Sequence, residues 1–178
     1  KVLGQGGFGV TYLAYDEELC QEVVLKKYRW EHGSLDNEVI NKRDYYKKQR
    51  KAFLNEARIL SSLFDIKEVV KVLDYFEERE NAYIVMEFVQ GISLRQYLES
   101  RNQPMSFTEA WNFLLPVMEA LEKVHQNKLI HRDISPDNFI IKEDGSIKLL
   151  DFGSAREYAE EKTMTVLVKK GYAPPEQY

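Results

Sequence analysis

The chain has 178 residues, of which 44% are hydrophobic and 30% are charged, and its net charge is −4. This composition excludes a disordered chain, and the length suffices for one good-sized domain or two small ones. The acidic balance argues against a protein that coats nucleic acid, and the one cysteine, Cys20, excludes an internal disulfide framework. No apolar run is long enough to cross a membrane, so we expect no membrane contact within these residues.

A glycine-rich segment lies near the start of the chain and reads G-Q-G-G-F-G-V over residues 4–10. The spacing G-x-G-x-x-G is weak by itself, because dinucleotide-binding folds and ordinary turns also contain it. In a dinucleotide-binding fold a helix begins inside the motif, whereas here the β-branched and aromatic residues 10–15 predict a strand. Two strands joined by a glycine turn form a flap whose backbone amides can close over phosphate groups.

The next predicted strand covers residues 22–26 and ends at Lys26. A lysine at a strand end usually faces solvent, and Lys27 would point to the opposite side of the strand. Residues 28–44 show no sustained period, so we predict a loop or irregular structure there.

A helix is predicted for residues 45–63, in which Phe53, Ala57 and Leu60 form an apolar face at i, i+4 and i+7. Glu56 lies one residue from this face. Taken alone, a glutamate at such a position is an exposed helix residue.

Two further strands are predicted for residues 68–76 and 82–88, paired antiparallel through the charged turn of residues 77–81, and a short helix is predicted to begin at residues 93–98. A longer helix follows the capping box of residues 106–109, in which a serine and a glutamate satisfy backbone amides. Its large apolar side chains recur at spacings of four and three and predict a core-facing stripe: Phe107, Trp111, Leu114, Met118, Leu121 and Val124.

The stretch from residue 129 to residue 151 places three polar groups, Asp133, Asn138 and Asp151, along short apolar runs. Residues 140–141 and 147–150 predict two strands, and the Asp-Gly pair between them suits the positive φ of a tight hairpin turn. Such a hairpin returns Asp151 close to Asn138, with Asp133 in the loop just before. Two carboxylates and one amide around one cavity suit Mg²⁺, which is often bound together with substrate phosphates.

The same residues carry a resemblance to a known family. His131-Arg132-Asp133, Asn138 five positions later and Asp151-Phe152-Gly153 match the signature of eukaryotic-type (Hanks-type) protein kinases. The segments HRDISPDN and GYAPPEQY resemble bacterial serine/threonine protein kinases in particular. The resemblance extends over nearly all 178 residues.

The resemblance implies an α+β, protein-kinase-like fold. Residues 1–86 would form a small antiparallel β N-lobe with one long helix, and residues 87–178 would form the hinge and the first part of a mainly helical C-lobe. We expect the chain to be a fragment that lacks the C-terminal helices of this lobe.

The resemblance also implies roles in phosphoryl transfer from ATP. Asp133 would orient the attacking hydroxyl and accept its proton, and Lys26 would hold the α- and β-phosphates while paired with Glu56. Asn138 and Asp151 would bind Mg²⁺. The positions implied to contact ATP are Leu3, Gly4, Gly6, Gly9, Val10, Val24, Lys26, Met86, Glu87, Val89 and Ile140.

Further roles concern packing and regulation. His131 is expected to pack and to hydrogen-bond locally, with Phe152 stacked beside it, rather than to transfer protons. Arg132 beside the catalytic aspartate indicates regulation by a phosphorylated residue in the activation segment, where Thr163 and Thr165 are better candidates than Ser154.

Three positions depart from the family pattern. Val24 stands where the family usually has alanine beside the adenine ring, and its additional methyl groups would alter nucleotide affinity. Ser135 stands where serine/threonine kinases commonly have a lysine that meets the γ-phosphate, and Lys169 stands where they commonly have a threonine. Our hypothesis is that Lys169 is catalytic and reaches the γ-phosphate from the activation segment, with Ser135 returning its hydrogen bond.

Together these residues predict a protein kinase that transfers the γ-phosphoryl group of ATP to Ser or Thr hydroxyls of protein substrates. An alternative is a pseudokinase or a nucleotide-sensing scaffold module without turnover, which Val24 and Ser135 leave open. A small-molecule kinase of related fold is disfavoured by residues 171–176, which resemble a segment that receives protein substrates.

The partners and the location follow from this prediction. We expect ATP and Mg²⁺ as cofactors, a protein substrate with Ser or Thr, and no nucleic-acid partner. Self-association for autophosphorylation is an option. The expected location is cytoplasmic, which includes the cytoplasmic domain of a membrane-anchored protein.

Overall fold

The computed structural model describes residues 1–178 apart from 7–8, 29–38, 79–80, 153–154, 158–170 and 173–178. For residues 6, 39–49, 52, 156 and 157 it describes the backbone alone. The chain divides into two compact units: unit 1 comprises Lys1–Ser62 and Lys71–Phe88, and unit 2 comprises Leu63–Val70 and Val89–Tyr178. Among the described residues, no helix is both long and apolar enough to span a membrane.

Unit 1 is built on a five-stranded antiparallel sheet with the strand order β1-β2-β3-β5-β4. The strands are β1 (Val2–Gly6), β2 (Gly9–Asp16), β3 (Gln21–Tyr28), β4 (Val72–Glu78) and β5 (Asn81–Glu87). On β5 the buried side chains of Ala82, Ile84 and Met86 alternate with partly exposed ones, because successive side chains of a strand point to opposite faces. β1 and β2 pair up to Gly6 opposite Gly9, so the two strands of the predicted glycine flap are confirmed.

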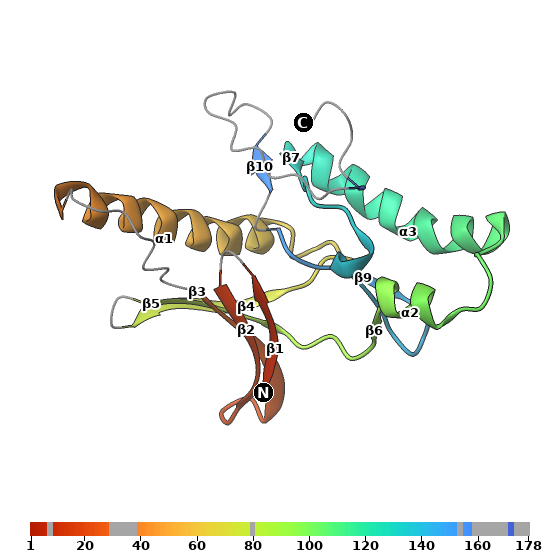
Figure 1. Ribbon diagram of the computed structural model, residues 1–178, viewed down its shortest axis with the longest axis horizontal. Coiled ribbons are helices and arrows are strands. Elements are labelled where there is room, and N and C mark those ends of the chain that lie inside the picture. Colours follow the sequence, from red (N-terminus) through yellow and green to blue (C-terminus); the bar gives the residue numbers. More distant parts are fainter. Residues whose placement is uncertain (7–8, 29–38, 79–80, 153–154, 158–170, 173–178) are drawn as a thin grey trace. The chain divides into compact units, whose positions relative to one another are not determined.

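One long helix of unit 1, α1 (Val39–Ser62), packs against β4 and β5 (Figure 1). Phe53, Ala57 and Leu60 are buried, which confirms the apolar face predicted from their spacing. The predicted start of this helix is wrong, because the helix begins at Val39 rather than at residue 45. The added turns show no apolar period in the sequence, but each residue that extends a nucleated helix gains one backbone hydrogen bond.

The described part of unit 2 contains two small sheets and two α-helices, which Figure 1 labels. β6 (Ile92–Ser93), β8 (Phe139–Ile141) and β9 (Ile147–Leu149) form a three-stranded sheet in the order β6-β8-β9, and β7 (Leu129–Ile130) pairs with β10 (Arg156–Glu157). The helices are α2 (Leu94–Ser100) and α3 (Phe107–Gln126), and a short 3₁₀ helix, η1 (Pro136–Asn138), precedes β8.

Both helices of unit 2 begin with a capping box. Ser93 accepts a hydrogen bond from the backbone amide of Gln96, and Ser106 accepts one from that of Glu109. In return, the side chains of Gln96 and Glu109 accept hydrogen bonds from the backbone amides of the two serines, so two backbone donors are satisfied at the start of each helix. The capping box predicted for residues 106–109 is therefore confirmed.

The segment Leu63–Val70 belongs to unit 2, although it lies inside the range 1–86 that the sequence assigns to the first lobe. The prediction of a strand from residue 68 is wrong, since β4 begins at Val72. Leu149 N donates to Glu68 O at 2.7 Å, and Val70 N donates to Leu149 O at 3.0 Å. The backbone of this segment is thus satisfied by β9 rather than by β5.

The prediction of a core-facing stripe on α3 is wrong for most of the helix. Phe107 is 81% exposed, and Trp111, Leu114 and Met118 are each more than 40% exposed. Val124 of the predicted stripe is buried as predicted, but the other buried side chains of α3, Val117 and Ala120, lie roughly a quarter turn or more away from that stripe. The helix has two apolar sides, and its contacts with β7 and β9 decide which one is covered.

Candidate active site

A buried ion pair joins β3 to α1 inside unit 1. Lys26 Nζ donates to Glu56 Oε1 at 2.8 Å and to Glu56 Oε2 at 3.1 Å. The two side chains are only 11% and 4% exposed. Charges taken out of water are costly unless they are paired and hydrogen-bonded, so each side chain makes the burial of the other tolerable. The predicted pairing is confirmed, and the role of Lys26 toward phosphates stays a prediction.

The strand register sets the surroundings of Lys26. Val24 lies two residues before Lys26, on the same side of β3, and pairs with Met86 on β5. Lys27 points the other way, as predicted: its Nζ lies 5.7 Å from the centre of the Tyr83 ring. Val24 and Lys26 therefore share a face of the sheet, as the ATP-binding prediction requires.

Gly9 is the glycine of the motif that close packing demands. A Cβ at Gly9 would lie 2.2 Å from the carbonyl oxygen of Lys27, so a side chain there would force β2 away from β3. A Cβ at Gly4 would meet nothing within 4 Å. Of the neighbouring predicted ATP positions, Leu3 is 45% exposed on β1 and Val10 is half-buried on β2.

Glu87 has a structural role that the sequence does not reveal. Its backbone N donates to Lys71 O at 2.9 Å, and its Oε1 accepts from Lys71 N at 2.9 Å. These two bonds fix the backbone of residue 71 to the end of β5. Of the remaining predicted ATP positions, Met86 is buried in unit 1, whereas Val89 and Ile140 belong to unit 2.

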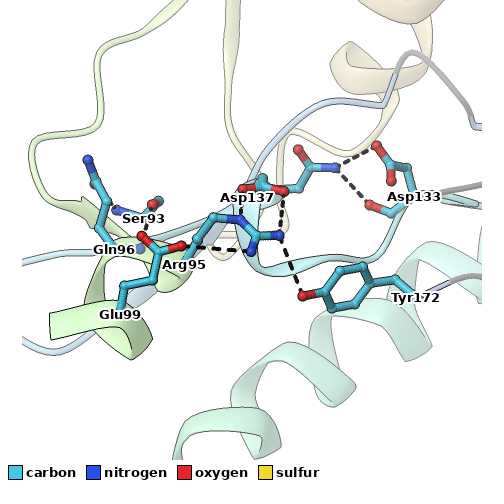
Figure 2. Close-up of polar contacts among 8 residues, drawn as sticks. Ser93, Arg95, Gln96, Glu99, Asp133, Asp137 and Tyr172 are labelled. Carbon is cyan, nitrogen blue, oxygen red and sulfur yellow. Dashed lines mark hydrogen bonds and ion pairs between the residues drawn. The ribbon is translucent and has the colours of Figure 1, made fainter. Parts of the chain in front are cut away.

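Asp133 and Asn138 are held together in unit 2 (Figure 2). Asn138 Nδ2 donates to Asp133 Oδ2 at 2.9 Å and to the backbone oxygen of Asp133 at 2.8 Å. Asn138 N also donates to Ser135 O at 2.9 Å, which closes the turn of η1. A carboxylate can only accept hydrogen bonds, so the amide nitrogen of Asn138 faces Asp133 and its amide oxygen faces away.

The predicted hairpin after Asn138 is confirmed. β8 and β9 pair antiparallel with Phe139 opposite Leu149, and Gly145 between them has a φ of +79°. Asp144 closes the turn by accepting hydrogen bonds from the hydroxyl and the backbone N of Ser146. These bonds stabilise the charged carboxylate and lower the pKa of Asp144 to about 2.

The hairpin returns the chain to Asn138. Leu150 N donates to Asn138 O at 2.8 Å, and Asp151 is the next residue. Asp151 and Arg132 have φ values of +54° and +68°, a left-handed conformation that is unfavourable for residues other than glycine. Such strain is retained where the surrounding structure fixes the backbone, often at functional sites.

His131 links the two loops of the site from the interior. The side chain is 1% exposed, its Nε2 donates to Leu150 O at 3.0 Å, and its Nδ1 accepts from Asp133 N at 3.2 Å. Both bonds require the neutral ring protonated on Nε2, and burial lowers the pKa of His131, which favours this form. The predicted packing and local hydrogen bonding of His131 are therefore confirmed.

The predicted stacking of Phe152 on His131 is wrong in its geometry. The two rings meet edge to face, with centroids 4.5 Å apart and planes at 63°. Edge-to-face contacts suit the charge distribution of aromatic rings, and the two hydrogen bonds of His131 already fix the plane of its ring. Phe152 is 1% exposed, so both rings belong to the core.

Arg95 is a site residue that sequence reasoning missed. It lies on α2, and its guanidinium binds the carboxylate of Asp137, the residue before Asn138 (Figure 2). An arginine in a short polar helix reads as solvated, so no pattern in the sequence points to this contact.

Several predicted residues cannot be compared with the structure. Lys169, Thr163 and Thr165 lie outside the described residues. Ser135, the proposed partner of Lys169, is 2% exposed and directly precedes η1. The roles of these residues stay predictions.

The donor set of this site fits Mg²⁺. The amide oxygen of Asn138 and the carboxylate of Asp151 are the hard oxygen ligands that this ion prefers. The described residues contain no cluster of three or more His, Cys, Asp or Glu side chains that could hold a metal ion. Mg²⁺ usually has one or two protein ligands and takes the others from phosphate and water.

The comparisons with known proteins agree on one family. The family model of the protein kinase domain matches residues 1–177. The chain is 37% identical over 180 residues to serine/threonine-protein kinase PrkC of Bacillus subtilis (strain 168), an alignment that covers 99% of this chain and 26% of the relative. It is 33% identical over 189 residues to serine/threonine-protein kinase PknA of Nostoc sp., with 99% of this chain and 32% of the relative covered.

A solved structure extends the similarity to the fold. The structure titled "PpkA-294 apo form" superposes with a TM-score of 0.71 at 30% sequence identity, covering 86% of this chain and 57% of that chain. The chain spans between about a quarter and a third of the length of the two curated relatives.

Proposed function

Because the chain belongs to the protein kinase domain family, we propose that it transfers the γ-phosphoryl group of ATP to Ser or Thr hydroxyls of protein substrates. One observation carries this proposal: the polar pair of each unit is intact. Unit 1 holds Lys26 against Glu56 at 2.8 Å, and unit 2 holds Asp133 against Asn138 at 2.9 Å. A module that binds nucleotide without turnover has no need for the second pair.

The residues of unit 2 suit proton acceptance. Among the described residues, Asp133 Oδ1 accepts no hydrogen bond, while Oδ2 is fixed by Asn138. One oxygen therefore orients the carboxylate and the other can take the proton of the attacking hydroxyl. His131 keeps the backbone of Asp133 in place through the bond from Asp133 N to its Nδ1.

The negative charge of the phosphates would be met by Lys26 and by Mg²⁺. Lys26, oriented by Glu56, would bind phosphate oxygens as a point charge. Asn138 and Asp151 would hold Mg²⁺, which when bound neutralises the negative charge that develops on the transferred group. Phosphoryl transfer depends mainly on such positioning and charge stabilisation, which these side chains would supply in part.

Lys169 and Ser135 complete the proposal for the γ-phosphate. Lys169 would reach this group from the activation segment, and Ser135 would accept its hydrogen bond. Lysines that stabilise transition-state charge contribute about a hundredfold or more to kcat, so Lys169→Met should lower kcat by that order. A kcat within about twofold of the wild type would exclude this role.

Regulation, partners and location are also proposals. Phosphorylation of Thr163 or Thr165 would regulate the activation segment through Arg132, and self-association would bring one copy to another for autophosphorylation. The similarity to PrkC, PknA and other proteins named as serine/threonine kinases supports a protein substrate. We place the domain in the cytoplasm, where ATP is abundant.

The decisive experiment is phosphoryl transfer from labelled ATP, with mass-spectrometric mapping of the phosphorylated sites. The purified protein is incubated with Mg·ATP and a generic acceptor such as casein, beside an Asp133→Asn variant. Transfer to Ser or Thr that is abolished in the variant is the expected result. Binding of Mg·ATP without transfer would refute the proposed activity and support the scaffold alternative.

A further inference from the structure

Arg95 contacts two segments that are distant in the sequence (Figure 2). Its Nη2 donates to Asp137 Oδ2 at 3.0 Å, and its Nε donates to Asp137 Oδ1. The same Nη2 lies 3.5 Å from the hydroxyl of Tyr172, and the guanidinium carbon lies 5.8 Å from the centre of the Tyr172 ring. One side chain of α2 thus joins η1 to Tyr172.

The contact with Asp137 is of a geometrically specific kind. Two parallel N–H donors of a planar guanidinium meet the two oxygens of one carboxylate, which fixes distance and orientation together. The side chains of Arg95 and Asp137 are 36% and 37% exposed, so solvent screens their attraction and the pair adds little to stability. Its structural value is therefore orientation rather than stabilisation.

The turn that Asp137 belongs to is short. η1 has only three residues, Pro136–Asn138, and its preceding residue Ser135 makes no side-chain capping bond to it. Asn138, which fixes the Asp133 carboxylate, is the last residue of this turn. A rotation of η1 would therefore displace Asn138 and, through it, the catalytic carboxylate.

Arg95 contacts Tyr172 as well as Asp137. Tyr172 is 45% exposed and follows Gly171, whose φ of +88° is a conformation that other residues rarely adopt. Its ring lies within the distance at which a guanidinium is attracted to an aromatic face. A change in the position of Tyr172 would thus be felt by Arg95 and by η1.

We propose that Arg95 is a positioning residue: through Asp137 it fixes the position of η1, and so of Asn138, relative to Tyr172. This inference rests on the proposed kinase activity. Arg95 acts through Asp137 and touches neither the phosphate-binding Lys26 nor the metal-binding Asp151. Its loss should therefore lower kcat for protein substrates and leave the KM for ATP nearly unchanged.

Arg101, which directly follows the last residue of α2, provides a matched control. Its guanidinium also binds a carboxylate, that of Glu109 at 3.2 Å, and it lies 5.5 Å from the ring centre of a tyrosine, Tyr97. These partners belong to α2 and α3 and not to η1. Arg101→Met therefore removes an equivalent surface contact without releasing the catalytic turn.

The test compares Arg95→Met, Arg95→Lys and Arg101→Met in the full-length protein. We expect kcat to fall about tenfold in Arg95→Met, less in Arg95→Lys, and not at all in Arg101→Met, because misplacement of reacting groups by a fraction of an ångström is costly. The KM for ATP should stay within about twofold of the wild type in all three variants, since the ATP contacts are kept. Equal losses of kcat in Arg95→Met and Arg101→Met, or no loss in either, would overturn the proposal.

Hydrogen–deuterium exchange of residues 131–138 separates this proposal from the kinase activity. Release of η1 should speed exchange in Arg95→Met relative to Arg101→Met, whether or not the protein transfers phosphate. If the wild type did not transfer phosphate but the two variants still differed in exchange, the proposed function would be refuted and the positioning role of Arg95 would be supported. Equal exchange in the two variants would refute the positioning role of Arg95.

Discussion

Neutralising one member of the buried Lys26–Glu56 pair should destabilise unit 1 more than removing both charges. Glu56→Gln deprives the Lys26 ammonium, which is 11% exposed, of the Glu56 carboxylate. Lys26→Met deprives the Glu56 carboxylate, which is 4% exposed, of the Lys26 ammonium. The double variant Lys26→Met/Glu56→Leu replaces both charges by apolar groups of similar length.

The magnitude follows from the geometry. At the 2.8 Å between Nζ and Oε1, and with an effective dielectric constant of about 20, the Coulomb attraction is about 6 kcal/mol. Desolvation of the two groups offsets much of this attraction, and removing one partner of a buried pair costs about 3–5 kcal/mol. We expect a loss of about 3 kcal/mol in each single variant and of about 1 kcal/mol or less in the double variant, because well-packed apolar replacements of buried pairs are often neutral.

Hydrogen–deuterium exchange of β3 and of the C-terminal half of α1 measures this effect locally. Global unfolding is less suitable, since a chain of two compact units need not unfold in one step. A loss of about 3 kcal/mol in opening free energy speeds exchange more than a hundredfold. If the double variant exchanged as fast as the sum of the single effects predicts, the two charges would be independent and our account of the pair would be refuted.

Three further predictions test other parts of the structure. Gly91→Ala should lower the stability of unit 2 by about 1–3 kcal/mol, because a Cβ there would lie 2.2 Å from Ile141 O, and hydrogen–deuterium exchange of β6 and β8 measures this loss; Gly4→Ala, whose Cβ meets nothing within 4 Å, is the control and should change this exchange little. Burial lowers the pKa of His131, so below about pH 6.5 the unfolded chain binds a proton that the folded chain does not. The free energy of unfolding should therefore fall with decreasing pH. Melting curves of His131→Gln between about pH 5 and 8 should lack this contribution of His131 to the pH dependence. Val24→Ala removes two methyl groups beside the predicted adenine position and should change the affinity for ATP; equal Kd values in titrations of both proteins would show that Val24 does not contact the base.

The sequence predicted those parts of the fold that depend on neighbouring residues. The capping box of Ser106 and Glu109 and the turn at Gly145 involve residues within four positions of one another, so residue type alone specifies them. The pairing of Lys26 with Glu56 is distant in sequence, and it was the resemblance to kinases that indicated it.

Other elements depend on what packs against them. The stripe of α3 from Phe107 to Met118 and the buried side of Val117 and Val124 are both apolar, and a period of 3.6 residues cannot tell which side meets β7 and β9. The segment Leu63–Val70 contains no signal that distinguishes pairing with β9 from pairing with β5. The packing free energy, summed over distant residues, decided which side of α3 is covered and which strand the segment Leu63–Val70 pairs with.

The candidate site shows the same division. From the sequence by itself we predicted which side chains carry the chemistry, since Asp133, Asn138 and Asp151 offer oxygen ligands at fixed spacing around a hairpin. Only the tertiary structure revealed the contacts of Arg95 with Asp137 and Tyr172, because these partners lie 42 and 77 residues away. A planar guanidinium binds any carboxylate that the fold brings within reach, so its partner is set by the folded backbone rather than by a local pattern.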